Sequence, residues 1–74
     1  EEAFEQKELQ DVLAKAIDML KEKDRLVLSL YYYEELTLKE IAEILGVSES
    51  RVSQLNNRAI SNLRAAMKKL KYID

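Results

Sequence analysis

The polar side chains that follow Ser48 could hydrogen-bond to the edges of DNA bases and to phosphate groups. Gln54 carries an amide that can pair with adenine N6 and N7, and Arg51 and Arg58 can donate to guanine or, more often, to phosphate. This chemistry is recognition rather than catalysis. The candidate DNA-binding residues are Glu49, Ser50, Arg51, Ser53, Gln54, Asn57 and Arg58.

Several of these candidates allow more than one role. Ser50 and Ser53 are short enough for a helix to approach DNA closely, and they can bond to bases or to phosphates. Asn57 could contact adenine or the DNA backbone. Glu49 could accept a hydrogen bond from cytosine N4, or it could cap its helix and repel nearby phosphates, and we favour capping because it stands at a helix start.

Such side chains need a helix that is held at a fixed angle to DNA, and residues 37–59 predict one. The segment reads as two helices joined by a tight turn, which is the arrangement of a DNA-binding helix-turn-helix. The pattern begins with a capping box, has its only glycine at the corner and places a small residue where the two helices must approach. The predicted structural positions of this unit are Thr37, Ala42, Gly46 and Ser48.

Apolar spacing predicts an all-α fold, a small four-helix domain that contains this unit. Apolar residues recur at intervals of three and four, and the chain has one Gly and no Pro. The polar run 21–24 is expected to contain the first break. The expected helices are residues 4–20, 24–35, 38–45 and 49–71.

Three sets of apolar residues are expected to pack inside the domain. The first helix contributes Leu9, Val12, Leu13, Ala16, Ile17 and Leu20. The turn unit contributes Leu38, Ile41, Ala42, Leu45 and Val47. The last helix contributes Val52, Leu55, Ala59, Ile60, Leu63, Met67 and Leu70.

The helix predicted over residues 24–35 is apolar on more than one side. Its three consecutive tyrosines cannot all face one way at helical spacing. Tyrosines at such positions are mostly core or boundary residues with hydrated hydroxyl groups, and the alternative is a docking surface for another protein. The candidate docking residues are Leu26, Leu30, Tyr32 and Tyr33.

Composition narrows the class of protein. The 74 residues make one domain, and the absence of Cys and His removes Cys-based zinc sites, disulfides and the commonest general base. No apolar run approaches the roughly 18 residues of a membrane span. We therefore expect a non-enzymatic intracellular domain with no cofactor, metal, membrane or small-molecule substrate. Because the chain opens on Glu rather than Met, we expect a fragment of a longer protein.

The charge is distributed unevenly along the chain. Residues 1–35 carry ten acids and five bases, net −5, whereas residues 36–74 carry four acids and seven bases, net +3. A basic stripe on an acidic body suits a duplex-binding surface, although a solvated helix face would look the same. For Lys68, Lys69 and Lys71 a solubilising role is favoured over DNA contact.

Three stretches, DRLVLSLYY at 24–32, EELTLKEIA at 34–42 and VSESRVSQL at 47–55, together with Arg58-Ala59-Ile60 and Leu63-Arg64, resemble region 4 of bacterial RNA polymerase sigma factors. YYYEELTLKEI and SESRVSQL are most similar to the flagellar branch. The resemblance implies a cytoplasmic, nucleoid-associated bacterial domain. It also implies binding of the −35 promoter element, docking on the polymerase β flap and capture by an anti-sigma factor.

The resemblance places Arg51, Ser53, Gln54 and Arg58 on the promoter-facing helix, together with Glu49 and Ser50. Primary members of the family often carry Arg then Glu where this chain has Glu49 and Ser50. They also often carry a basic residue at the position of Ser53. We therefore expect this chain to prefer a different −35 sequence. The family's common Pro at the start of the second helix is also missing. The alternatives are the effector domain of a response regulator, which usually dimerises, and a helix-turn-helix module that binds protein instead of DNA.

Overall fold

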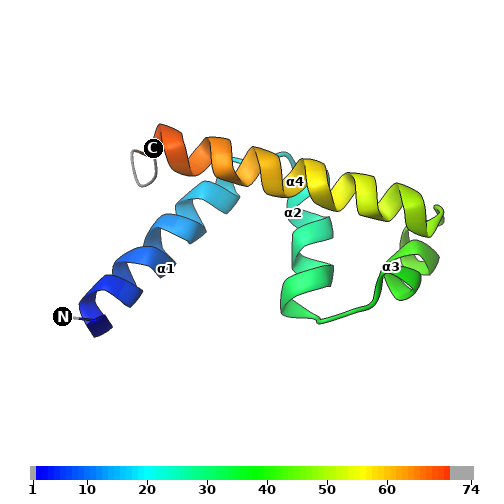
Figure 1. Cartoon of the computed structure of the whole chain (residues 1–74), viewed down its shortest axis with the longest axis horizontal. Coiled ribbons are helices and arrows are strands. Elements are labelled where there is room, and N and C mark those ends of the chain that lie inside the picture. The colour runs from blue at the N-terminus through cyan, green and yellow to red at the C-terminus, as the bar shows by residue number, and fades with distance from the viewer. Residues whose placement is uncertain (1, 71–74) are drawn as a thin grey trace.

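Helix α4 (Glu49–Lys69) is the element against which the other three helices pack. The computed structural model describes the backbone of residues 2–70 and the side chains of residues 8–70. In the described chain, α1 (Glu2–Asp18) and α2 (Glu22–Leu28) lie along one side of α4, and α3 (Leu38–Leu45) lies at its beginning (Figure 1). The predicted all-α fold of four helices with a helix-turn-helix is confirmed.

The first break in the helical chain lies earlier than the sequence predicts. α1 ends at Asp18 and α2 already begins at Glu22, whereas the break was expected within 21–24. Arg25 explains the early turn, because its guanidinium donates to the carbonyl oxygens of Asp18 at 3.4 Å and Leu20 at 3.2 Å. A cation from the next helix thus satisfies carbonyl groups that are left free where α1 ends.

The helix predicted over 24–35 is only partly α-helical. After Leu28 it widens into a π-helical turn, η1 (Ser29–Tyr33), in which the amide of Glu34 donates to the carbonyl of Ser29 at 3.0 Å. Glu35 then adopts φ 54°, a left-handed conformation that is uncommon for a residue with a side chain. The wide turn and the left-handed residue end the helix and direct the chain toward α3.

The core consists of two clusters on the inner face of α4. Ala59 is fully buried, and Leu20 of the α1–α2 corner and Leu28 of α2 pack into the same cluster. Val52 forms the second cluster with Ile41 and Ala42 of α3. Several partly buried residues surround this second cluster, namely Leu30, Tyr31, Leu36, Leu38 and Leu45.

The predicted inner face of α4 is largely correct but is displaced at its end. Leu55 is buried as expected, and Ala66, which the prediction omitted, is buried as well. Leu70 is 37% exposed and Val47 in the turn is 38% exposed, so neither belongs to the core. Of the apolar stripe predicted over residues 4–20, Ala16 in α1 and Leu20 just after it are buried. The remaining members of the stripe are partly buried, namely Leu9, Val12, Leu13 and Ile17.

A partly buried hydrogen bond links α2 to α4. The side chain of Asp24 is buried, and its Oδ2 accepts a hydrogen bond of 2.8 Å from Nδ2 of Asn62. Asp24 also stands in the first turn of α2, where a carboxylate is favoured by the helix dipole. The bond therefore favours this contact between the two helices, because the buried Asp24 side chain would be costly without its partner.

Substitutions at Gly46 can test how much the left-handed backbone at the corner between α3 and α4 matters for stability. Its φ is +70°, yet a Cβ added there would meet no atom within 4 Å. Gly46→Ala is therefore expected to lower the free energy of unfolding by about 1 kcal/mol, through left-handed backbone strain and not through a clash. Gly46→Asn is the control and should cost less, because Asn visits this conformation more readily. Denaturant unfolding of the three chains measures the difference, and an Ala chain as stable as the Gly chain would contradict it.

Candidate nucleic-acid interface

α3 begins at a complete capping box. The Thr37 hydroxyl accepts from the Glu40 amide at 3.1 Å, and Oε1 of Glu40 accepts from the Thr37 amide at 2.9 Å. Two amide groups that a helix start normally leaves free are thereby satisfied. The pair fixes where α3 begins and hence where its apolar residues meet α4.

The corner between α3 and α4 also follows the predicted chemistry. Gly46 ends α3 in the left-handed conformation, and the amide of Val47 donates to the carbonyl of Ala42 at 3.1 Å. Ser48 then caps α4, because its Oγ accepts from the amide of Arg51 at 3.1 Å. Small Ala42 is buried at the contact with Val52, so α3 braces α4 closely.

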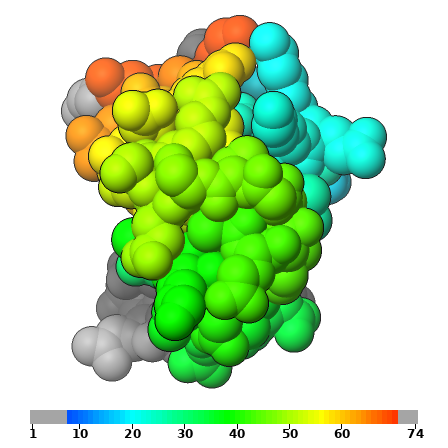
Figure 2. Space-filling view, turned by 90° about the vertical axis from the view of Figure 1, so that its right-hand side faces the viewer, coloured from blue at the N-terminus to red at the C-terminus, as the bar shows by residue number. Residues whose placement is uncertain are grey.

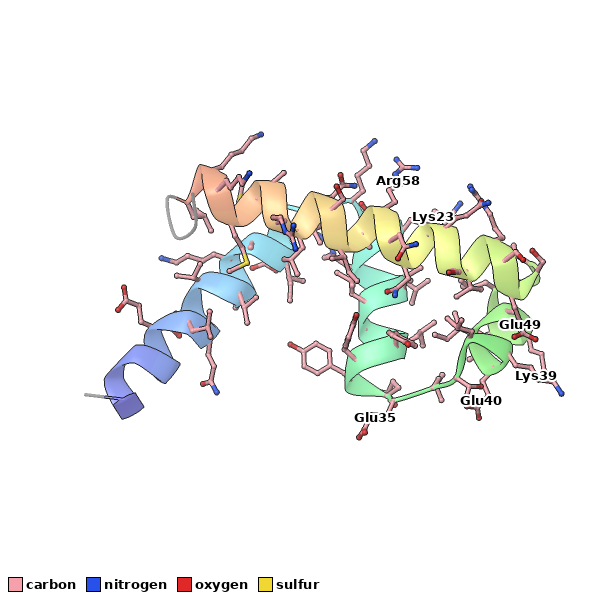
Figure 3. All side chains as sticks on the ribbon, in the orientation of Figure 1. Lys23, Glu35, Lys39, Glu40, Glu49 and Arg58 are labelled. Carbon is pink, nitrogen blue, oxygen red and sulfur yellow. The ribbon has the colours of Figure 1, made fainter. Side chains whose placement is uncertain are left out.

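This bracing leaves the polar face at the start of α4 open to solvent. Figure 2, which views this end of the molecule, shows α3 and the beginning of α4 as one continuous exposed surface. In Figure 3, Arg58 points away from the helices that lie beneath α4. Of the candidate DNA-binding residues only Ser53 is partly covered, and the exposed ones are Glu49, Ser50, Arg51, Gln54, Asn57 and Arg58.

Two of these side chains form a pair. Nη1 of Arg51 donates to Oε1 of Gln54 at 3.3 Å. The residues are three apart, so they lie one above the other on the same face of α4. Arg51 is also held through its backbone by the Ser48 cap, so the pair projects from the first turns of the helix.

The electrostatic character of this face is basic. Glu49 is the acid of the first turn of α4, and the helix ends with Lys68 and Lys69 in its last turn. Arg64 and Lys68 are exposed further along the helix. Lys71 lies outside the described residues. The exposed arginines and lysines of this helix can contact phosphates. The exposed amide and hydroxyl side chains beside them can contact base edges as well.

A second surface lies on another side of α4. It is an apolar groove of about 420 Å³ between α1, the α2–η1 segment and α4. Tyr32 and Tyr33 contribute to it and are 54% and 74% exposed, whereas Leu30 packs against the α3–α4 core and Leu26 is exposed outside the groove. The groove is lined by Leu13, Ile17, Leu28, Tyr32, Tyr33, Ile60 and Leu63.

The sequence assigned four of these lining residues only to the core. Leu13, Ile17, Ile60 and Leu63 have the spacing of a buried helix face, and each is partly buried. Figure 1 shows that α1 diverges from α2 beneath α4, and the groove lies between these elements. Helical periodicity carries no signal for that divergence.

Two features are absent from the described part of the chain. Residues 8–70 contain no grouping of three or more His, Cys, Asp or Glu side chains that could hold a metal ion. Within the same described chain, every helix is too short or too polar to cross a membrane.

Comparison with known proteins agrees with this geometry. Residues 16–65 match the family model described as Sigma-70, region 4. The chain is 62% identical to RNA polymerase sigma factor FliA of Pseudomonas aeruginosa over 58 residues, which are 78% of this chain and 24% of that protein. It is 53% identical to FliA of Escherichia coli over 62 residues, 84% of this chain and 26% of that protein. It is 44% identical to the sigma-D factor of Bacillus subtilis over 70 residues, 95% of this chain and 28% of that protein.

The pH dependence of the capping box can be tested directly. Hydrogen bonds from the Thr37 amide and then the Thr37 hydroxyl hold the pKa of Glu40 below its ordinary value of 4.5. Because the pKa is lower in the folded chain, the contribution to stability is fully present above about pH 4.5 and is lost as the pH falls through the lower folded value.

Glu40→Gln is the matched variant, because Gln can complete a capping box but does not titrate. In denaturant unfolding between pH 7 and pH 3, the wild-type chain should lose stability relative to the Gln variant once the pH falls below the ordinary Glu value. A constant difference between the two chains across this range would show that Glu40 has no lowered pKa.

Proposed function

This chain belongs to the sigma-70 region 4 family, and we propose that it recognises the −35 element of bacterial promoters as part of a flagellar-type sigma factor. The family consists of DNA-binding domains of transcription initiation, not enzymes. The chain spans about a quarter of the length of the curated relatives it matches, so promoter recognition would depend on a longer protein. The domain would act in the bacterial cytoplasm, where promoters and polymerase are.

The observation that carries the proposal is the exposed polar face of a braced helix. A major groove admits one α-helix, and that helix must present side chains of the right length over its first turns. Gln54, Asn57 and Arg58 lie on the exposed side of α4 while Val52 and Leu55 hold its other side in the core. We propose that this face enters the groove, with Arg51 and Arg58 reaching phosphates or guanine.

The base preference should differ from that of primary sigma factors. Two acceptor-bearing residues, Glu49 and Ser50, stand at the start of α4. By the family resemblance, Ser53 stands where primary sigma factors often carry a basic side chain. Ser53 is also partly covered, so its reach toward DNA is small. These differences support recognition of a distinct −35 element, as suits a sigma factor that serves a separate set of promoters.

We propose that the apolar groove is where the β flap of polymerase docks. The groove is open, lined almost entirely by apolar atoms of three helices, and has the size to accept the apolar side of a helix. Tyr32 and Tyr33 at its edge provide large side chains with polar ends, which are enriched where proteins bind each other. An anti-sigma factor that covers the same groove would compete with polymerase for this domain.

The promoter contact can be tested with a double variant. Arg51→Ala with Gln54→Ala removes two exposed side chains and leaves the core of the domain unchanged. In holoenzyme containing the full-length sigma factor, this variant should bind a promoter with its −35 element more weakly by a few kcal/mol, because each good base contact contributes about 1–3 kcal/mol.

Arg64→Ala is the charge-matched control, since it removes an exposed cation of α4 that lies outside the proposed contact set. It should weaken binding less, and equally for DNA with and without the −35 element. Equal promoter affinity of the double variant and the wild type at the same salt concentration would refute the proposed promoter contact.

The docking surface can be tested at Tyr33, which is exposed enough for its removal to spare the fold. Tyr33→Ala should weaken binding of the full-length sigma factor to a β-flap fragment by about 1–2 kcal/mol. Tyr33→Phe retains the ring and should bind nearly as wild type. Calorimetric titration measures both variants, and unchanged affinity of the Ala variant would remove Tyr33 from the docking surface.

A further inference from the structure

We propose that Arg51 sets the direction in which the Gln54 amide faces promoter DNA, so that the pair prefers bases whose exposed edge offers only hydrogen-bond acceptors. The inference rests on the proposed function and extends it from a helix face to the chemistry of one base contact. It makes Arg51 a positioning residue for Gln54 in addition to any phosphate contact of its own.

The geometry of the pair determines which end of the amide is free. Nη1 of Arg51 lies 3.3 Å from Oε1 of Gln54, and both side chains are exposed on the same face of α4. A guanidinium group only donates hydrogen bonds, so the amide atom that faces it must be the carbonyl oxygen. The Nε2 group of Gln54 is therefore the end that points away from Arg51 and remains available.

The position of Arg51 is itself fixed by the start of the helix. Its amide donates to the Ser48 hydroxyl at 3.1 Å, which ties the backbone of Arg51 to the N-cap of α4. The corner at Gly46 and the buried contact of Val52 hold that turn against α3. With the backbone of this turn held, the bond from Arg51 is the contact that orients the Gln54 amide in the unbound domain.

The major-groove edges of the four bases respond differently to such a donor. Guanine presents N7 and O6 as acceptors and thymine presents O4, whereas cytosine presents an amino donor. Adenine presents an acceptor beside a donor, and a free glutamine binds both. When the glutamine oxygen already accepts from arginine, its hydrogen bond from the adenine N6 amino group is weakened. The pair should therefore favour guanine or thymine over adenine and disfavour cytosine most.

Two substitutions separate the base contact of Gln54 from the orienting role of Arg51. Gln54→Glu keeps the shape of the side chain and its acceptor for Arg51, but it removes the donor that would face the base. A carboxylate accepts from cytosine N4, so this variant should shift the preference to cytosine at one position. Arg51→Ala leaves Gln54 intact and frees its oxygen, so adenine should gain at that same position.

Asn57→Asp is the matched control for the added negative charge. It introduces the same charge one turn further along the exposed face of α4. A general repulsion between a carboxylate and DNA would lower the affinity of both acidic variants without moving the preference to cytosine at the position read by Gln54.

The experiment selects from duplex DNA randomised across the −35 element, with holoenzyme that contains the full-length sigma factor, and sequences the bound fraction. The expected result is a change of about tenfold toward cytosine for Gln54→Glu and about fivefold toward adenine for Arg51→Ala, both at one position. Circular dichroism of each variant confirms that the helices are retained.

The outcomes are distinguishable. If Gln54→Glu changes one position and Arg51→Ala leaves that position unaltered, the coupling between the two residues is refuted while promoter recognition stands. If Gln54→Glu changes no position, Gln54 does not read a base and the inference is refuted. If wild-type holoenzyme shows no preference anywhere in the randomised element, the proposed function itself fails.

Discussion

One side of α4 must stay apolar along most of its length because three other helices pack there. Val52 meets α3 near the start of the helix, and Ala59 meets the leucines of α2 and the α1–α2 corner further on. The small Ala59 side chain lets these elements approach closely, and it is fully buried as a result. The opposite side is left free of packing constraints, and this freedom is what allows polar side chains to gather there.

The same helix thus contributes to two surfaces that do not overlap. Gln54 and Arg58 lie on its outward face, whereas Ile60 and Leu63 lie in the groove between α1 and α2. A partner in the groove would leave the outward face uncovered. Under the proposed function, the domain would hold DNA on one side and protein on another at the same time, with α4 connecting the two surfaces.

The features that the sequence predicts well are those determined by residues close together in the chain. The capping box of Thr37 and Glu40, the left-handed Gly46 and the Ser48 cap each depend on neighbours within three or four positions, and each is present. Specific contacts between distant residues were not predicted. The bond between Asp24 and Asn62 joins positions 38 residues apart, and the groove arises only from the way that helices diverge.

The π-helical turn is formed by neighbouring residues, yet the sequence did not predict it. Its residues are adjacent in the chain, but neither Gly nor Pro marks the turn. Glu35 adopts a left-handed conformation, although it is not one of the residue types, such as Gly or Asn, that usually do so. The exposed surface at the start of α4 was predicted more completely, because polar residues on one side of a helix and apolar residues on the other are visible in the spacing alone. Ser53 is the exception, since the extent of its coverage depends on packing.

The widened turn at Ser29–Tyr33 has a consequence for evolution by insertion and deletion. Such a turn holds one residue more than an ordinary α-helical turn, so a related chain could lose a single residue here and close the turn into regular α-helix. The flanking helices would keep their register. An alignment of this family should therefore tolerate a one-residue gap at this turn more readily than inside α2 or α3.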